Sequence, residues 1–195
     1  MKPYFETSHL AGLLLLIVTM AWGAMELAHT SNTRDGATRA GGGGRRFAVV
    51  PVVIAASVML YLAPPVVPAA AIRPGAAAFA VGMVVLLGGL VLRGWSIKTL
   101  GEYFTGRVTV SADQPVIAVG PYRLLRHPSY TGLLLACAGT GLASANWVAV
   151  AAMVVLPLAA VLWRIHAEEH ALLAALCDRY GGYAAQHKRL VPLIW

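Results

Sequence analysis

The stretch TGLLLACAGTGLASANWVAVAAMVVLPLAAVLW, residues 131–163, decides the fold because it is almost wholly apolar and too long for one membrane span. A transmembrane helix needs only about 20 apolar residues to cross the hydrocarbon core of a bilayer. In the middle of the stretch, GLASAN at residues 141–146 has the small and polar residues of a turn. We therefore predict a tight helical hairpin, with a short fourth span followed by a longer fifth span.

Three further apolar runs precede this hairpin, and each approaches the length of a membrane-spanning helix. They cover residues 10–28, 47–68 and 75–92. Pro51 and the pair Pro64-Pro65 interrupt the second run, where we expect a kink or an early stop. The polar linker at residues 30–46 contains four consecutive glycines, and we expect it to be flexible.

The composition also indicates a membrane protein. Of the 195 residues, 58% are hydrophobic and 12% are charged, and the mean hydropathy is +0.70. A soluble domain carries about 25% charged residues. We predict an all-α, polytopic integral membrane protein that forms a single domain over residues 1–195, with five transmembrane helices. Residues 1–75 would hold the first two spans and the linker.

The positive charges set the predicted orientation. With the N-terminus outside and five spans, all but two of the 15 Lys and Arg residues fall on the cytoplasmic side. The two exceptions are Lys2 and Arg73. This asymmetry follows the positive-inside rule, whereas reading the hairpin as one span would move the cations of the tail outside. The net charge of +7 is therefore explained by membrane topology.

Beyond the fifth span, apolar residues recur at helical spacing and predict an amphipathic cytosolic extension of the same helix. These residues are Leu172, Leu173, Leu176 and Tyr180. Gly181-Gly182 should end the helix.

Several classes of function find no support in the sequence. There is no run of Lys and Arg with interleaved aromatic residues that would indicate a nucleic-acid site. Cys137 and Cys177 have neither the spacing of metal ligands nor that of a disulfide framework, so we expect no metal site. No feature points to an obligate protein partner.

Two polar clusters lie at opposite ends of the hairpin, and the span count therefore places them on one side of the membrane and close in space. The first is GPYRLLRHPSYTG, residues 120–132, and the second is Glu168-Glu169. Pro128 suits the first turn of a helix and turns His127 away from the helix axis, beside free amides that favour an anion. The alternative is a membrane-interface anchor made of Arg and Tyr side chains.

The acidic pair also has two interpretations. About 100° of helix separates adjacent residues, so we expect one of Glu168 and Glu169 to face the bundle and the other the solvent. Glu168 follows Arg164 by four residues, a spacing that suits a simple surface salt bridge. Alternatively, one carboxylate binds ribose hydroxyls or balances a cationic cofactor. A weaker third cluster, Arg93, Trp95 and residues 99–105, is typical of an interfacial re-entrant segment.

These motifs resemble those of the isoprenylcysteine carboxyl methyltransferase family, and the chain looks like a prokaryotic member, related to membrane phospholipid methyltransferases. The resemblance covers roughly residues 85–195. It depends most on Arg126-His-Pro-Ser-Tyr-Thr-Gly132 paired with the downstream Glu168-Glu169. Supporting matches are Gly120-Pro-Tyr-Arg123, the pattern within residues 93–105, and the tail residues Tyr180-Gly181 and 191–194.

The resemblance implies S-adenosyl-L-methionine as methyl donor and S-adenosyl-L-homocysteine as product, bound by the last two helices and the tail. Residues 76–195 would then hold the third span and the cofactor-binding catalytic core, at the cytoplasmic face of a prokaryotic cell membrane. Arg126 would orient an anionic, lipophilic acceptor, either a small molecule or a prenylated one, and Glu168 would share the catalytic work. The residues implied to line the cofactor site are Gly120, Tyr122, His127, Pro128, Tyr130, Gly132, Glu168 and Glu169.

The chemistry of the acceptor separates the possible reactions. A carboxylate is ionised at neutral pH and needs no general base, and Arg126 can hold it by two parallel hydrogen bonds. A thiol or an amine must lose a proton, and His127 is then the candidate base. Carboxyl O-methylation of an isoprenylcysteine-like substrate is our leading hypothesis. Thiol S-methylation, phospholipid N-methylation, a nicotinamide-dependent reductase and a non-catalytic membrane protein are the alternatives.

Two features of the sequence need a structure to be interpreted. The tail departs from the family pattern Phe-Gly-x-x-Tyr-x-x-Tyr, because Tyr180-Gly181-Gly182-Tyr183 is one residue short and Gln186 or His187 stands in place of the second Tyr. Small residues on two helices either admit a prenyl tail or let the helices pack closely. These residues are Ala78 and Gly82 on one helix, and Gly132, Ala136 and Thr140 on the other.

Overall fold

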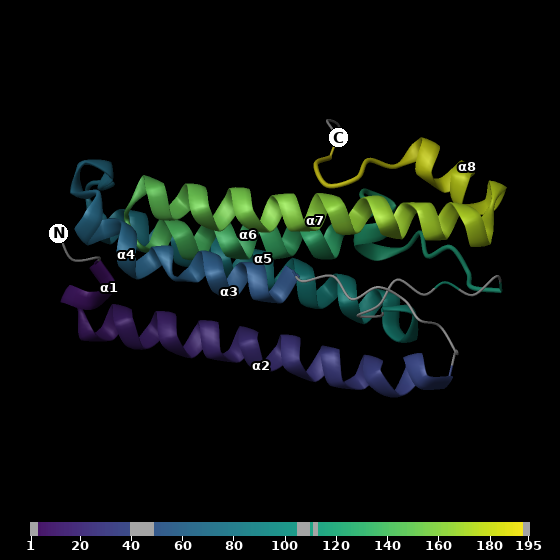
Figure 1. Cartoon of the computed structure of the whole chain (residues 1–195), viewed down its shortest axis with the longest axis horizontal. Coiled ribbons are helices and arrows are strands. Elements are labelled where there is room, and N and C mark those ends of the chain that lie inside the picture. The colour runs from purple at the N-terminus through teal and green to yellow at the C-terminus, as the bar shows by residue number, and fades with distance from the viewer. Residues whose placement is uncertain (1–3, 40–48, 105–109, 111–112, 193–195) are drawn as a thin grey trace.

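The computed structural model describes residues 4–39, 49–104, 110 and 113–192, and within these ranges the chain is helical with no β-strand. The helices lie side by side along the long axis of the molecule (Figure 1). In chain order they are α1 (Tyr4–Thr7), α2 (His9–Arg39), α3 (Val49–Ser57), α4 (Met59–Val66), α5 (Gly75–Leu100), α6 (Pro128–Ala143), α7 (Trp147–Leu176) and α8 (Asp178–Gln186). Short 3-10 turns cover Pro68–Ala70, Gly101–Tyr103 and Gly120–Arg123.

Four segments of the described chain are long and apolar enough to cross a membrane: His9–Glu26, Val49–Val66, Gly75–Tyr103 and Trp147–Leu176. The helix predicted as a short fourth span is present as α6, but it has only 16 residues. At 1.5 Å per residue it is about 24 Å long, less than the roughly 30 Å of a bilayer core. Membrane spanning by α6, and hence the total of five spans, stays a prediction.

The helical hairpin predicted from the sequence is confirmed by the turn between α6 and α7. Asn146 caps α7, because its side-chain oxygen accepts hydrogen bonds from the amides of Val148 (2.9 Å) and Ala149. Its side-chain nitrogen donates to the carbonyl oxygen of Val67 at 3.1 Å. Ala145 takes a φ of 55°, which lets the chain reverse within three residues. The two helices therefore run antiparallel, and their far ends meet.

Glycines let α5 and α6 approach closely along their whole length. A Cβ atom built on Gly139 would lie 2.3 Å from the backbone nitrogen of Leu86, and one on Gly132 would lie 2.7 Å from that of Arg93. Gly82 and Gly89 face α6 in the same way. The small residues on these two helices therefore serve helix packing, which leaves no space for a prenyl tail at the close-contact positions.

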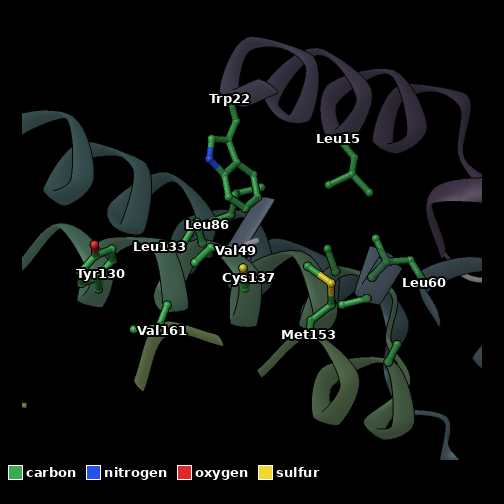
Figure 2. Packing of buried hydrophobic residues seen from close by; sticks show 14 of the residues in the cluster. Leu15, Trp22, Val49, Leu60, Leu86, Tyr130, Leu133, Cys137, Met153 and Val161 are labelled. Carbon is green, nitrogen blue, oxygen red and sulfur yellow. The ribbon is translucent and has the colours of Figure 1, made fainter. Parts of the chain in front are cut away.

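Side chains buried between the helices are mainly apolar, and Figure 2 shows Leu86, Cys137 and Met153 packed together with Trp22 of α2 nearby. The outward faces are also apolar: Val84 and Val91 are 71% and 69% exposed. Large apolar surfaces on the outside are unfavourable in water but suit contact with lipid. The pattern fits a protein that spans a membrane.

Two helices continue beyond the ends predicted from the sequence. α2 extends to Arg39, so residues 30–39 are helical rather than a flexible linker, and residues 40–46 lie outside the described residues. Extending an existing helix costs less than starting one, which explains why polar residues continue it. α5 extends to Leu100 and the turn Gly101–Tyr103 follows, so the described part of residues 99–105 is not a re-entrant segment.

α5 continues through the buried residue Arg93 because other groups compensate the charge of its side chain. Its guanidinium forms an ion pair with Glu26 of α2, with Nη2 donating to Oε2 at 2.7 Å. Its Nη1 donates to the carbonyl oxygen of Ser129 at 3.0 Å. Trp22 donates to Glu26 at 3.1 Å. This pair therefore ties the N-terminal helix to α5 and to the start of α6.

Two other breaks differ from the expected positions. The second apolar run is divided at Val58, between α3 and α4, and the helix ends at Val66 just after Pro64-Pro65. The early stop is confirmed, while the break at Val58 is not at a proline. The helix after the fifth span ends at Cys177, where φ is 46°, and Gly181-Gly182 lie inside α8 instead. The predicted extension of α7 is therefore confirmed as far as Leu176, whereas its continuation to Tyr180 is wrong because the positive φ at Cys177 redirects the chain.

Candidate functional site

The segment before α6 forms a bend that we call the elbow, residues 120–127. It begins with the 3-10 turn Gly120–Arg123, where Gly120 takes a φ of 57° that favours glycine. It ends at His127, whose φ and ψ of −128° and 54° are not helical, and α6 starts at Pro128. The sequence prediction that Pro128 opens the helix and turns His127 off its axis is confirmed.

Glu169 of α7 is the centre of a buried ionic cluster that holds the elbow. Arg126 Nη1 lies 2.7 Å and His127 Nε2 lies 3.2 Å from its Oε1, and Arg189 Nε donates to Oε2 at 3.0 Å. Glu169 is only 6% exposed. A buried carboxylate with several charged and polar partners fixes their positions, because separating them would leave a charge uncompensated. Glu169 therefore joins α7, the elbow and the tail.

Glu168 belongs to a different network, on the pocket side. Tyr130 donates its hydroxyl hydrogen to Glu168 Oε2 at 2.8 Å, and the same hydroxyl oxygen accepts a hydrogen bond from Arg164 Nε. The guanidinium carbon of Arg164 also lies 5.8 Å from the centre of the Tyr130 ring. Glu168 is half-buried and lines the pocket described below. Tyr130 thus stands between the two residues that the sequence suggested as a surface salt bridge.

The C-terminal tail lies against the elbow. The backbone amide of Arg126 donates to the carbonyl oxygen of Lys188 at 2.7 Å. The backbone amide of His127 donates to the carbonyl oxygen of Arg189 at 3.0 Å. The hydroxyl of Thr131 donates to the carbonyl oxygen of Leu190 at 2.8 Å. The shortened motif in the tail therefore still allows it to pair with the elbow.

Helix α8 completes this side of the site with two tyrosines. Tyr183 donates its hydroxyl hydrogen to the carbonyl oxygen of Tyr122 at 2.8 Å, and Leu125 O lies 3.2 Å away. The ring of His187, in place of the family's second Tyr, stacks on Tyr183 with centres 4.2 Å apart. Arg179 donates to the carbonyl oxygen of Gln114 at 2.6 Å and so holds the segment after α5.

A pocket of about 90 Å³ lies between these elements. Its walls come from the end of α5 and the segment after it, from the elbow and the start of α6, and from α7 and α8. The lining residues are Leu100, Tyr103, Phe104, Val110, Gln114, Pro115, Val116, Ile117, Tyr122, Arg126, His127, Ser129, Tyr130, Glu168, Leu172, Leu176, Tyr180 and Tyr183. It combines apolar walls with a few polar groups, as small-molecule sites usually do.

The structure brings five of the predicted site residues into this pocket and gives the other four different positions. Tyr122, Arg126, His127, Tyr130 and Glu168 line it. The remaining four pack around it: Gly120 lies against Thr99 and Trp95, Pro128 is buried at the start of α6, Gly132 lies against the backbone of α5, and Glu169 holds the elbow.

The prediction did not include several residues that line the pocket. Leu172 and Leu176 lie one and two helical turns after Glu168 on α7, so the helical spacing already placed them on its face. Tyr180 and Tyr183 come from α8, and the tail motif was the signal that could have found them. No pattern in the sequence indicated residues 114–117.

Burial keeps the tyrosines of the site uncharged. Desolvation raises the pKa of Tyr122 and of Tyr180 well above the usual value of a tyrosine, and it raises the pKa of Tyr183 to about 12. Nearby carboxylates raise the pKa of Tyr122 and Tyr180 further, while Arg126 acts in the opposite direction on Tyr180. All three hydroxyls are therefore protonated at neutral pH and can donate hydrogen bonds.

Residues 80–174 match the family model for the isoprenylcysteine carboxyl methyltransferase family. The chain is 30% and 31% identical, over 120 residues, to protein-S-isoprenylcysteine O-methyltransferases B and A of Arabidopsis thaliana. In both cases the match covers 58% of this chain and 58% of the relative. A Tribolium castaneum protein-S-isoprenylcysteine O-methyltransferase is 31% identical over 116 residues, which are 58% of this chain and 41% of that protein.

The fold is similar to a solved structure of a eukaryotic intramembrane Ras methyltransferase of the isoprenylcysteine carboxyl type. The TM-score is 0.63 and the sequence identity is 26%, and the match covers 74% of this chain and 52% of that chain. The chain thus spans less than two thirds of the length of each of these relatives. The matched region includes α6, most of α7, and both polar clusters.

Proposed function

We infer from the match over residues 80–174 that the chain is a member of the isoprenylcysteine carboxyl methyltransferase family, and we propose that it is an integral membrane methyltransferase that uses S-adenosyl-L-methionine. The acceptor is a lipophilic carboxylate of the isoprenylcysteine type. The observation that carries the proposal is one pocket lined by both Arg126 of the elbow and Glu168 of α7. A cation for the acceptor and an anion for the methyl donor are thus available in the same space.

The residues of the pocket fit the proposed methyl donor. When bound, S-adenosyl-L-methionine supplies an electrophilic methyl group on a positively charged sulfonium. Glu168 offers a half-buried carboxylate that can balance this charge or accept hydrogen bonds from ribose hydroxyls. The rings of Tyr122 and Tyr130 offer aromatic faces, which also attract cations. S-adenosyl-L-homocysteine, the product, lacks the positive charge and should be released more easily.

The pocket favours a carboxylate over a thiol or an amine as acceptor. A carboxylate is already ionised at neutral pH, so the protein has only to align it and exclude water. Arg126 lines the pocket and carries a permanent charge. A thiol or an amine would instead need a base to remove its proton. The permanent charge of Arg126 in the pocket therefore supports carboxyl O-methylation.

We also propose that the pocket opens at the cytoplasmic face of a prokaryotic cell membrane, with the N-terminus outside. The distribution of Lys and Arg supports this orientation. The acceptor is then a small lipophilic molecule or a prenylated one that reaches the pocket from the membrane.

The proposal is tested by incubating membranes that contain the protein with methyl-labelled S-adenosyl-L-methionine and N-acetyl-S-farnesylcysteine. A base-labile labelled product is expected, because methyl esters hydrolyse in alkali. Arg126→Ala should abolish transfer, because the acceptor carboxylate loses its charged partner. Arg123→Ala removes an exposed arginine three residues away and is the matched control.

Two outcomes would contradict the proposal. A labelled product that resists alkali would indicate methylation of a thiol or an amine instead. Absence of any binding of S-adenosyl-L-homocysteine to the folded protein would exclude a methyltransferase and favour a non-catalytic membrane protein.

A further inference from the structure

Two buried polar atoms in the described part of the chain have no hydrogen-bond partner, and both belong to residues that line the pocket. They are Arg126 Nε and the hydroxyl oxygen of Tyr180. Tyr180 comes from α8, whereas Arg126 comes from the elbow. The two atoms therefore reach one pocket from separate elements of the fold.

Leaving such groups without partners is unfavourable. Buried polar groups are nearly always hydrogen-bonded, and a buried donor that lacks a partner destabilises the fold. The rest of the Arg126 side chain is well held, with Nη1 at 2.7 Å from Glu169. Two unpartnered atoms in one pocket therefore point to a ligand that supplies the missing contacts.

We propose that Arg126 Nε and the Tyr180 hydroxyl form a subsite for a carboxylate of a bound ligand. This inference rests on the proposed function, and it assigns a binding role to Tyr180 that the sequence motifs did not. The carboxylate belongs either to the lipophilic acceptor or to the amino-acid part of the methyl donor.

The chemistry of the two atoms selects an anion. Arg126 Nε can only donate a hydrogen bond. The Tyr180 hydroxyl stays protonated because burial raises its pKa, so it also donates. Two hydrogen-bond donors and a permanent positive charge, on residues that line one pocket, favour an oxygen anion over a neutral acceptor.

Arg126 also brings a permanent positive charge to the subsite. Its side chain is only 15% exposed, so this charge is largely shielded from water.

The experiment compares charged ligands with neutral counterparts in purified wild-type protein and Tyr180→Phe. The acceptor pair is N-acetyl-S-farnesylcysteine and its carboxamide. The donor pair is S-adenosyl-L-homocysteine and its decarboxylated analogue. The substitution removes one hydroxyl and introduces the residue of the family pattern, so we expect it to fold. Tyr61→Phe, at an exposed position on α4, is the matched control.

For one of the two ligand pairs, Tyr180→Phe should reduce the ratio of the affinity for the charged ligand to the affinity for the neutral ligand by roughly tenfold. This is the loss expected for a hydrogen bond to a charged group. Affinity for the neutral counterpart should stay unchanged. The ligand pair for which the variant protein no longer favours the charged member identifies the molecule whose carboxylate occupies the subsite. Arg126→Lys, which keeps the charge but lacks Nε, should reduce the same preference.

If Tyr180→Phe and Arg126→Lys leave both preferences unchanged while the melting temperature shows a folded protein, the inference is overturned. This outcome is distinct from failure of the proposed function. Charge-dependent binding that responds to Tyr180→Phe supports the subsite even if no methyl transfer is detected, whereas active enzyme with unchanged preferences contradicts the subsite alone.

Discussion

Glu168 and Glu169 are neighbours in the chain but belong to different networks. Glu169 is buried and contacts three residues of the elbow and the tail, whereas Glu168 lines the pocket and accepts a hydrogen bond from Tyr130. The turn of the helix between adjacent residues is enough to direct the two carboxylates to different partners. We infer that Glu169 maintains the architecture and that Glu168 meets the ligand.

Replacing each carboxylate by its amide separates these roles. Glu169→Gln should lower the free energy of unfolding by about 1–3 kcal/mol, because Arg126 loses its counter-charge at a largely buried position while Arg189 stays partly solvated. Glu168→Gln should retain the fold but weaken binding of S-adenosyl-L-methionine by roughly tenfold, as for the loss of a charge-assisted hydrogen bond. Thermal unfolding in detergent and ligand titration measure the two effects.

Each variant serves as the control for the other. Equal destabilisation by both, or unchanged ligand affinity in Glu168→Gln, would contradict the division of roles.

At the scale of elements, the packing of α5 against α6 supports the site from behind. Arg93 of α5 contacts the carbonyl oxygen of Ser129, next to the elbow, and Gly132 of α6 lies against the backbone of Arg93. The start of α6 can therefore keep its position only if the two helices stay close. Small residues on two facing helices are the sequence feature that permits this approach.

Gly139→Ala should disturb this packing, because the added Cβ atom would lie 2.3 Å from the backbone of Leu86. We expect a loss of about 1–3 kcal/mol in the free energy of unfolding, as for other overpacked contacts. Gly88→Ala on α5 is the matched control, since a Cβ atom there meets nothing within 4 Å. It should be neutral or stabilising by up to about 1 kcal/mol, because Ala favours a helix over Gly.

Unfolding in detergent, followed by circular dichroism, measures both glycine variants. An equal effect of the two substitutions would show that close contact between α5 and α6 is not what the glycines provide.

At the scale of the whole molecule, the polar groups gather at one end of an otherwise apolar bundle. The elbow, the acidic pair, α8 and the tail all lie there, as Figure 1 shows for α8 beside the end of α7. The remaining helix faces are largely apolar and exposed. In a membrane, this arrangement would hold the pocket at one interface, within reach of both a water-soluble methyl donor and a lipophilic acceptor.

The two native cysteines allow the sidedness of this end to be measured. Cys177 is exposed beside the pocket end of α7, while Cys137 is buried. A membrane-impermeant maleimide should label Cys177 in inverted membrane vesicles but not in intact cells, if this end is cytoplasmic. Cys177→Ser should abolish the labelling. Labelling of Cys177 in intact cells would contradict the orientation that the positive charges predict.

The helical membrane class, the hairpin, the start of α6 at Pro128 and the meeting of the elbow with the acidic pair could all be predicted from the amino-acid sequence. These features depend on local quantities: apolar length, turn residues, and the restrictions that proline places on the backbone. Chain reversal at Asn146 then brings residues 126–130 and 168–169 together without further information. Their assignment as site residues remains a prediction, although five of them line the pocket.

Only the tertiary structure decided which carboxylate holds the elbow, which glycines serve packing and which tyrosines reach the pocket. Tyr180 enters it because the helix breaks at Cys177, where a positive φ redirects the chain, and no rule of composition predicts that break. Arg93 stays buried inside α5 because Glu26 lies opposite on α2. Such outcomes depend on contacts between residues distant in the chain, whereas periodicity and hydropathy report only the surroundings of each segment.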